Sequence, residues 1–154
     1  MYMTLIPGPN NEMITASVAP AYGSTVNYIQ VNSTGTPGVT ITTSATFPYA
    51  VISGSISTGG NPIQITCYGD VDPLNTGGWG ECQLYRNSTP IGTIVRFEAG
   101  STFSKNSPFS MIYIDDVPSG VYTYYLKVNT LYSHSFRFGK VDTPTFSLLE
   151  LGRV

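Results

Sequence analysis

Charged residues are scarce in this sequence of 154 residues. Lys, Arg, Asp and Glu make up 10% of the chain, whereas they make up about a quarter of an average soluble domain. The seven basic residues are scattered and the formal net charge is −2, so the sequence offers no basic patch for a phosphate backbone. We therefore expect no nucleic-acid partner. A polar but nearly uncharged surface suits contact with other copies, because burying hydroxyl groups costs far less than burying ions.

Residues for catalysis and metal binding are also few. The single histidine, His134, stands between two serines at the start of an expected strand, and we interpret it as a strand-edge residue. No nucleophile elbow, phosphate-binding glycine loop or HExxH motif is present. Asp70 and Asp72 resemble the first half of a calcium loop, but Leu74 stands where the third oxygen ligand is needed. The sequence thus predicts a protein that is not an enzyme and holds neither a cofactor nor a metal.

Long apolar runs are missing as well. No stretch is long enough to cross a bilayer, and the opening MYMTLIPGPNNE has no basic region and is interrupted by Pro7. We therefore expect neither membrane insertion nor a secretory signal. Residues 1–25 mix apolar residues with prolines, and we interpret them as an arm that precedes a domain over residues 26–154.

What the sequence has in abundance is β-branched and aromatic residues between turns rich in Gly and Pro. The clearest strand, residues 121–129, follows the turn Pro118-Ser119-Gly120 and is apolar on both faces, so we expect it at the centre of its sheet. No segment keeps a 3.6-residue apolar period. Nine further strands are expected at residues 26–31, 38–43, 50–57, 62–68, 81–86, 91–98, 108–115, 134–138 and 145–151. This pattern predicts an all-β chain, with a two-sheet antiparallel jelly roll of about ten strands as the leading topology.

The two cysteines, Cys67 and Cys82, lie on consecutive expected strands. If these strands pair as a hairpin, Ile65 faces Leu84 and Cys67 faces Cys82 on the inward side, and a disulfide is geometrically reasonable. Two buried free thiols are supported equally well, since free cysteine is among the most buried residue types. The sequence does not reveal the redox compartment, so both interpretations stay open.

Three ordered segments within residues 38–151 resemble a known family. They read PIQITCYGDVDPLNTGGWGECQLYRNSTPIGTIV, PFSMIYIDDVPSGVYTYYLKVNT and SHSFRFGKVDTPTFSLLEL. Together they resemble the C1q/TNF-like jelly-roll heads of viral and phage structural proteins. The resemblance implies a ten-stranded two-sheet jelly roll that forms a trimer around a three-fold axis on a virus particle. No Gly-X-Y repeat or heptad stalk accompanies the domain in this sequence.

On this resemblance, we expect a minor capsid or fibre-head component that serves particle assembly or host attachment. Residues 1–25 would then contact other capsid proteins. The candidate trimer-interface residues are aromatic: Tyr122, Tyr124, Tyr125, Phe136, Phe138 and Phe146. Among these, Tyr124 and Phe138 are expected to line the axis.

An alternative function is a carbohydrate- or receptor-binding β-sandwich module. Its candidate ligand-binding residues are Trp79, Asp70, Asp72 and Asn75, with or without calcium. Trp79 stands in a glycine-rich stretch, where a tryptophan can stack on a sugar or anchor an interface. The other interpretation is that Trp79 covers one end of the core, because tryptophan is highly buried on average.

Overall fold

The computed structural model of the chain describes residues 28–32, 39–41, 47, 49–74, 79–98, 107–131, 135–138 and 144–152. Within these residues the chain forms ten strands and no helix: β1 (Tyr28–Asn32), β2 (Val39–Ile41), β3 (Tyr49–Thr58), β4 (Ile63–Pro73), β5 (Trp79–Arg86), β6 (Thr89–Glu98), β7 (Ser107–Asp115), β8 (Gly120–Leu131), β9 (Phe136–Phe138) and β10 (Thr145–Glu150). All ten predicted strands are present. The largest difference is in β4, which continues to Pro73 instead of ending at residue 68.

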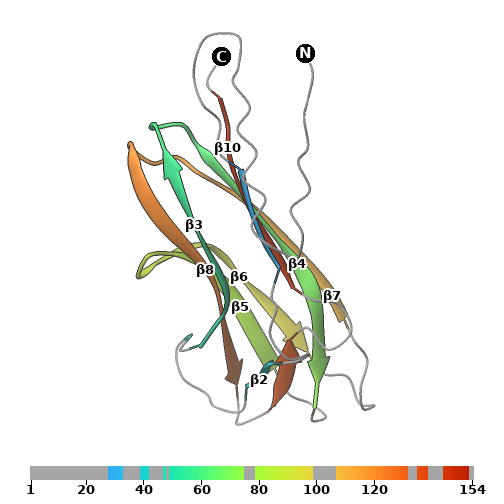
Figure 1. Cartoon of the computed structure of the whole chain (residues 1–154). Helices are drawn as coiled ribbons and strands as arrows, with labels where there is room; N and C mark the ends of the chain where they lie inside the picture. The colour runs from blue at the N-terminus through green and yellow to red at the C-terminus, as the bar shows by residue number, and fades with distance from the viewer. Residues whose placement is uncertain are drawn as a thin grey trace.

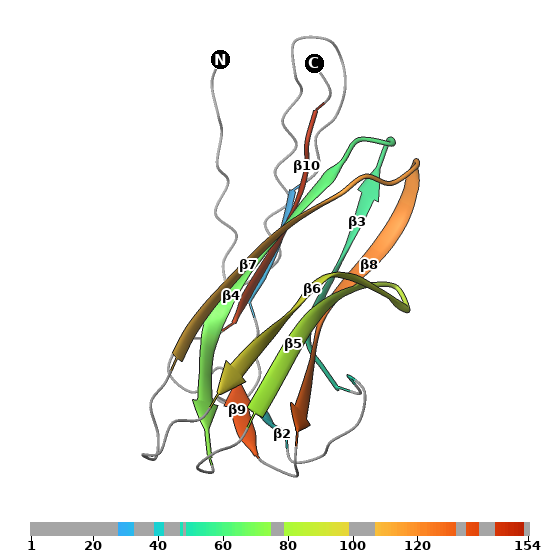
Figure 2. The same cartoon turned by 180° about the vertical axis from the view of Figure 1, so that it is seen from behind.

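Two antiparallel sheets lie face to face (Figure 1, Figure 2). The first contains β3, β8, β5 and β6 in this order. The second is built on β4, which pairs with β7 along one edge and with β10 and β9 along the other. Because β10 pairs with the first half of β4 and β9 with its end, these two short strands lie one after the other along that edge. β1 and β2 pair with β10 and β9 in the same way.

Each sheet is therefore four strands wide, and the order of the strands is that of a jelly roll. β1 with β2, and β9 with β10, each count as one interrupted strand. Numbered along the chain, the resulting eight strands run 1-8-3-6 in one sheet and 2-7-4-5 in the other. This confirms the predicted two-sheet jelly roll. It also confirms the position of the segment 121–129, now part of β8, at the centre of its sheet between β3 and β5.

The core fills the space between the sheets, and the alternation along the strands decides which side chains enter it. Ile63, Ile65 and Cys67 of β4 are fully buried, whereas Tyr68 is 48% exposed, as the sequence predicted. At Gly80 the sheets come so close that a larger residue would have to displace a side chain of the opposite sheet. A Cβ atom on Gly80 would lie 3.0 Å from the ring of Phe136 in the opposite sheet.

Four of the six candidate trimer-interface residues belong to this core. Tyr124, Phe136, Phe138 and Phe146 are each at most 2% exposed, and the rings of Phe138 and Phe109 pack edge to face. Their side chains are enclosed by their own domain, so the expectation that Tyr124 and Phe138 line a three-fold axis is wrong. The two remaining candidates, Tyr122 and Tyr125, are half-buried. Their role in a trimer interface stays a prediction.

The cysteines do not lie on a hairpin, which corrects the pairing assumed from their spacing. β4 and β5 belong to different sheets, so Cys67 faces Cys82 across the core rather than along a ladder. Both thiols are free and fully buried, and Cys82 Sγ lies 3.5 Å from Met111 Sδ. Burial raises the pKa of Cys82 to about 12 and also raises the pKa of Cys67, to which the nearby Cys82 contributes. The thiols are therefore protonated and unreactive at neutral pH.

Several predictions fall on residues outside the described ranges. These are the arm (residues 1–25), the loop residue Asn75 and the histidine at position 134. Within the described ranges, no helix is long and apolar enough to span a bilayer.

Candidate functional site

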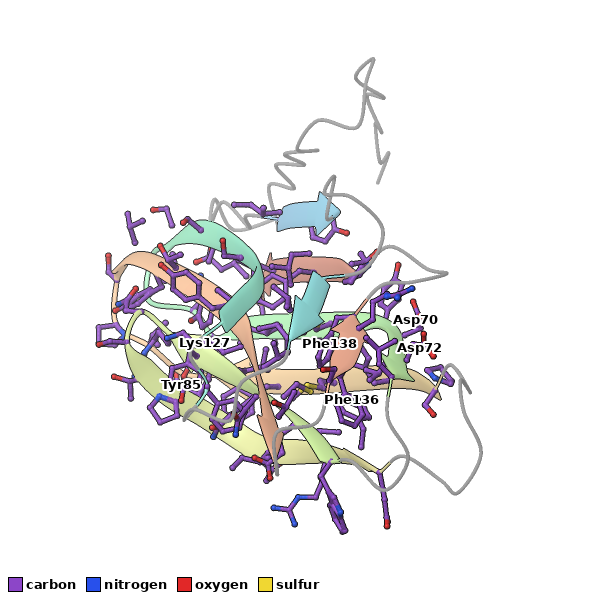
Figure 3. All side chains as sticks on the ribbon, turned by 90° about the horizontal axis from the view of Figure 1, so that it is seen from below. Asp70, Asp72, Tyr85, Lys127, Phe136 and Phe138 are labelled. Atoms are coloured by element: carbon purple, nitrogen blue, oxygen red, sulfur yellow. The ribbon has the colours of Figure 1, made fainter. Side chains whose placement is uncertain are left out.

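The structure separates the candidate ligand-binding residues that the sequence grouped. Asp70 and Asp72 lie on β4 and are buried, with 3% and 0% of their surface exposed. Trp79 is the first residue of β5, in the other sheet, and so lies on a strand rather than in a loop. Figure 3 shows the two aspartates on the opposite side of the sandwich from Tyr85 and Lys127. In the part of the chain that the structure describes, no group of three or more His, Cys, Asp or Glu residues is arranged to hold a metal.

One buried carboxylate, Asp115, joins the two sheets. Arg86 Nη1 donates to both of its oxygens at 2.8 and 2.9 Å, and the hydroxyl of Tyr124 donates to Oδ2 at 2.8 Å. Burial and this hydrogen bond raise the pKa of Tyr124 well above its usual value. Asp115 is thus the last residue of β7 and part of a network between the sheets.

A second buried carboxylate, Glu150, holds the connection between β3 and β4. Its Oε1 accepts hydrogen bonds from Thr58 Oγ1 at 2.7 Å, from the backbone N–H of Gly59 at 2.9 Å and from Asn61 Nδ2 at 3.0 Å. Donors therefore surround this carboxylate as they surround that of Asp115. Both carboxylates connect parts of the fold that are distant in sequence.

The outer face of the sheet β3-β8-β5-β6 carries a group of aromatic rings around one lysine, which we call the aromatic–lysine face. It is defined by Gln83 and Tyr85 of β5, Thr123, Tyr125 and Lys127 of β8, and Ser53 and Ser55 of β3. Lys127 Nζ lies 4.3 Å from the ring centroid of Tyr85 and 5.9 Å from that of Tyr125. These are cation–π contacts, which orient the ammonium group without neutralising its charge.

Trp79 lies at the other end of β5. The guanidinium carbon of Arg96 stands 5.2 Å from the centroid of its ring. Arg96 is itself fixed by Glu81, whose Oε1 accepts from Nε at 2.9 Å and from Nη2 at 2.6 Å. Since Gly80 faces the core, Trp79 points outward, and it is half-buried under this arginine. It does not cover an end of the core, which corrects that interpretation.

The outer face of the opposite sheet has a different chemistry, and we call it the isoleucine face. Ile112 and Ile114 of β7 are 67% and 56% exposed, and Tyr68 of β4 is 48% exposed. They stand in register with Thr66, Gln64 and Ser110. None of the outward residues at positions 64, 66 and 68 of β4, 110, 112 and 114 of β7, and 147 and 149 of β10 is charged. The sequence analysis did not identify the isoleucine face. The run Met111-Ile112-Tyr113-Ile114 is apolar on both sides of its strand, and this pattern was the available signal that an apolar side chain would point away from the core.

A cleft of about 220 Å³ separates β6 from β7, where the edges of the two sheets meet. Gly92 and Val95 line it from β6, and Met111, Ile112 and Tyr113 line it from β7. Gly92 has a positive φ of 67°, and a Cβ atom there would lie 3.2 Å from the ring of Tyr113. Ile112 borders both the cleft and the isoleucine face, so the apolar surface continues around this edge of the sandwich.

The jelly-roll order places the chain in a class of two-sheet sandwiches that includes viral capsid and lectin domains. No family model matches the sequence, and no curated protein matches it. Solved structures do match its fold. The structure of the Gx strain of infectious bursal disease virus matches 97% of this chain with a TM-score of 0.50 and 13% identity. The structure of T=1 particles derived from the same virus matches 95% with a TM-score of 0.54 and 11% identity.

The Gt strain of this virus gives a similar match, with a TM-score of 0.50 and 11% identity over 97% of the chain. In the three structures the matched part is 37%, 40% and 43% of the viral chain. The present chain thus spans about two fifths of the length of the proteins that it resembles. At this level of identity the likeness establishes the fold.

Proposed function

We propose that this protein is a non-enzymatic structural component of a virus particle that assembles with copies of itself. The observation that carries the proposal is the fold, because nearly the whole chain superposes on part of proteins whose structures were solved as virus or virus-derived particles. The location that follows is the surface of a virion. The described buried carboxylates Asp115 and Glu150 hold the structure together, which agrees with a role in assembly rather than in catalysis.

The isoleucine face is the surface that we assign to self-assembly. Ile112 and Ile114 expose most of their side-chain surface to solvent, and burying an isoleucine side chain contributes about 1.5–3 kcal/mol. The surrounding outward positions are Ser, Thr, Gln, Tyr and Leu, and desolvation of their neutral polar groups costs far less than that of an ion. An uncharged surface also suits contact between identical copies, because no like charges meet there.

The finer features of the proposal follow the resemblance to C1q/TNF-like heads. We propose a homotrimer that acts as a minor capsid or fibre-head component, with residues 1–25 contacting other capsid proteins. Of the aromatic candidates that are not fully buried, Tyr122 packs against the core and Tyr125 lies on the aromatic–lysine face, so neither belongs to the surface assigned to self-assembly.

Host attachment through a glycan or receptor is the second candidate function. The aromatic–lysine face favours it, because aromatic rings, a cation and hydroxyl groups lie together on one open sheet. Trp79 belongs to the same sheet, whereas the buried Asp70 and Asp72 belong to the other.

The native mass in solution tests the assembly proposal. The full-length chain is expected to elute as a trimer in size exclusion with light scattering, and the double variant Ile112→Ser/Ile114→Ser as a monomer. Val121→Ser is a matched control, because Val121 is 71% exposed but lies on the other sheet; its native mass should not change. A monomeric full-length protein would contradict self-assembly. A double variant that keeps the trimer would contradict the assignment of the isoleucine face.

A further inference from the structure

We propose that the aromatic–lysine face binds an acidic oligosaccharide, with Lys127 contacting a carboxylate of the sugar and Tyr125 packing against a sugar ring. The proposal rests on the second candidate function, attachment to a glycan, and does not depend on self-assembly. The site combines three features that lie side by side on the strands: a cation, aromatic rings and neutral hydrogen-bonding groups.

The strand register brings these features together. Lys127 pairs with Gln83 across β5, and Tyr125 pairs with Tyr85 on the same side. Toward β3, Tyr125 pairs with Ser53. The alternation of β8 places residues 123, 125 and 127 on the outer face, because Tyr124, Leu126 and Val128 between and beyond them are fully buried.

The charge of Lys127 sets it apart from the other cations of this sheet. Arg86 forms a salt bridge with Asp115 and Arg96 forms one with Glu81. No described carboxylate forms a salt bridge with Lys127, which instead stands over two tyrosine rings. The rings hold the ammonium group in place by cation–π attraction, but they carry no counter-charge. A ligand carboxylate would supply that charge and accept a charge-assisted hydrogen bond from Nζ.

The surroundings of Lys127 favour a sugar over other acidic ligands. Ser53 is exposed, and Ser55 Oγ and Thr123 Oγ1 form a hydrogen bond of 2.8 Å on the exposed face. Hydroxyl and amide groups of this kind donate to and accept from the hydroxyl groups of a sugar. The C–H face of a pyranose ring packs against an aromatic face, as apolar groups do. A nucleic acid would need several cations to match its phosphates, whereas this face offers one.

A second copy of the chain is a poorer partner for this face. The isoleucine face, to which we assign self-assembly, has no charged residue at its outward positions and therefore cannot neutralise Lys127. The two outer faces are thus suited to different partners, a copy of the chain on one side and an anionic sugar on the other.

Titration of the full-length protein with 3′-sialyllactose and with lactose, followed by NMR or calorimetry, tests the proposal. The acidic sugar is expected to bind about tenfold or more tightly than lactose, as one charge-assisted hydrogen bond predicts. Lys127→Met should remove the difference between the two sugars, since it keeps the apolar stem and loses the charge. Lys127→Arg should restore the preference, and Tyr125→Ser should weaken the binding of both sugars. Val121→Ser, on the same sheet but outside the site, should bind like the original protein.

Each variant is first checked for an unchanged native mass and thermal midpoint. If Lys127→Met does not fold, the comparison of Lys127→Arg with Gln83→Ala takes its place, and only the alanine variant should lose affinity. Equal affinity for the two sugars, or no binding of sialyllactose at millimolar concentration, would overturn the proposal. So would a folded Lys127→Met variant that still prefers the acidic sugar. None of these results depends on whether the protein is a trimer, so the assembly proposal stands or falls separately.

Discussion

The two outer faces of this sandwich arise from the same strand alternation but differ in chemistry. The isoleucine face exposes Ile112 and Ile114 among neutral polar residues, whereas the aromatic–lysine face places Lys127 over Tyr85 and Tyr125. Both faces are attached to one core, so the fold itself does not decide what either face contacts. We therefore expect the choice of partner to depend on a few outward side chains, which can be changed without rebuilding the sandwich.

The largest expected effect comes from a side chain that supports both faces at once. Phe136 is 1% exposed and packs against Gly80 of the opposite sheet. Phe136→Ala is expected to lower the free energy of unfolding by about 3–5 kcal/mol, through lost burial and the cavity left behind. In chemical denaturation of monomeric protein, Ile112→Ala should cost about 0.5 kcal/mol or less, because its side chain is exposed. Equal losses for the two variants would contradict the distinction between core and face.

Alkaline pH is expected to weaken the core, which the two outer faces share. An unfolded cysteine ionises near pH 8.5, whereas burial raises the pKa of Cys82 to about 12. Above about pH 8.5 the unfolded chain therefore binds fewer protons than the folded one, and stability falls as pH rises, by up to about 1.4 kcal/mol per pH unit for each thiol.

Urea denaturation between pH 8 and pH 9.5 measures this slope. Cys82→Ala provides the control, because it removes one of the two thiols and should reduce the slope by about half. A free energy of unfolding that stays constant over this interval would show that the thiols are not protonated and buried as described.

The smallest effect on the fold is expected from a single charge placed on each face in turn. Thr66→Lys puts a cation beside Ile112 on the isoleucine face, and Ser53→Lys puts one beside Tyr125 on the other face. Both should change the free energy of unfolding by no more than about 0.5 kcal/mol, as is usual for surface positions. Their native masses should differ, however: Thr66→Lys is expected to be monomeric, and Ser53→Lys to remain assembled. The opposite result would exchange the roles of the two faces.

The comparison also shows how far the candidate site could be predicted. The sequence singled out Trp79 and Tyr125, which do lie on the sheet β3-β8-β5-β6. It grouped Trp79 with Asp70 and Asp72 because these residues are near in sequence, but the strands that carry them, β5 and β4, belong to different sheets. Neither Lys127 nor Ile112 was recognised, since a lone lysine and an isoleucine in a strand are ordinary until the neighbouring strands are known.

The local pattern of residues was enough to predict the strands and, for most of them, which side chains point inward. β-branched and aromatic residues favour an extended backbone, and the period of two places Ile63, Ile65 and Cys67 inward and Tyr68 outward without reference to any other strand. Which strands pair, and which aromatic face enters the core, depends on contacts between distant parts of the chain. β8 is apolar on both sides, so alternation alone could not tell that Tyr124 is enclosed and Tyr125 is not. The pairing of β4 with β7 and β10 is a contact between distant parts of the chain, and the local pattern of a strand does not encode its partner.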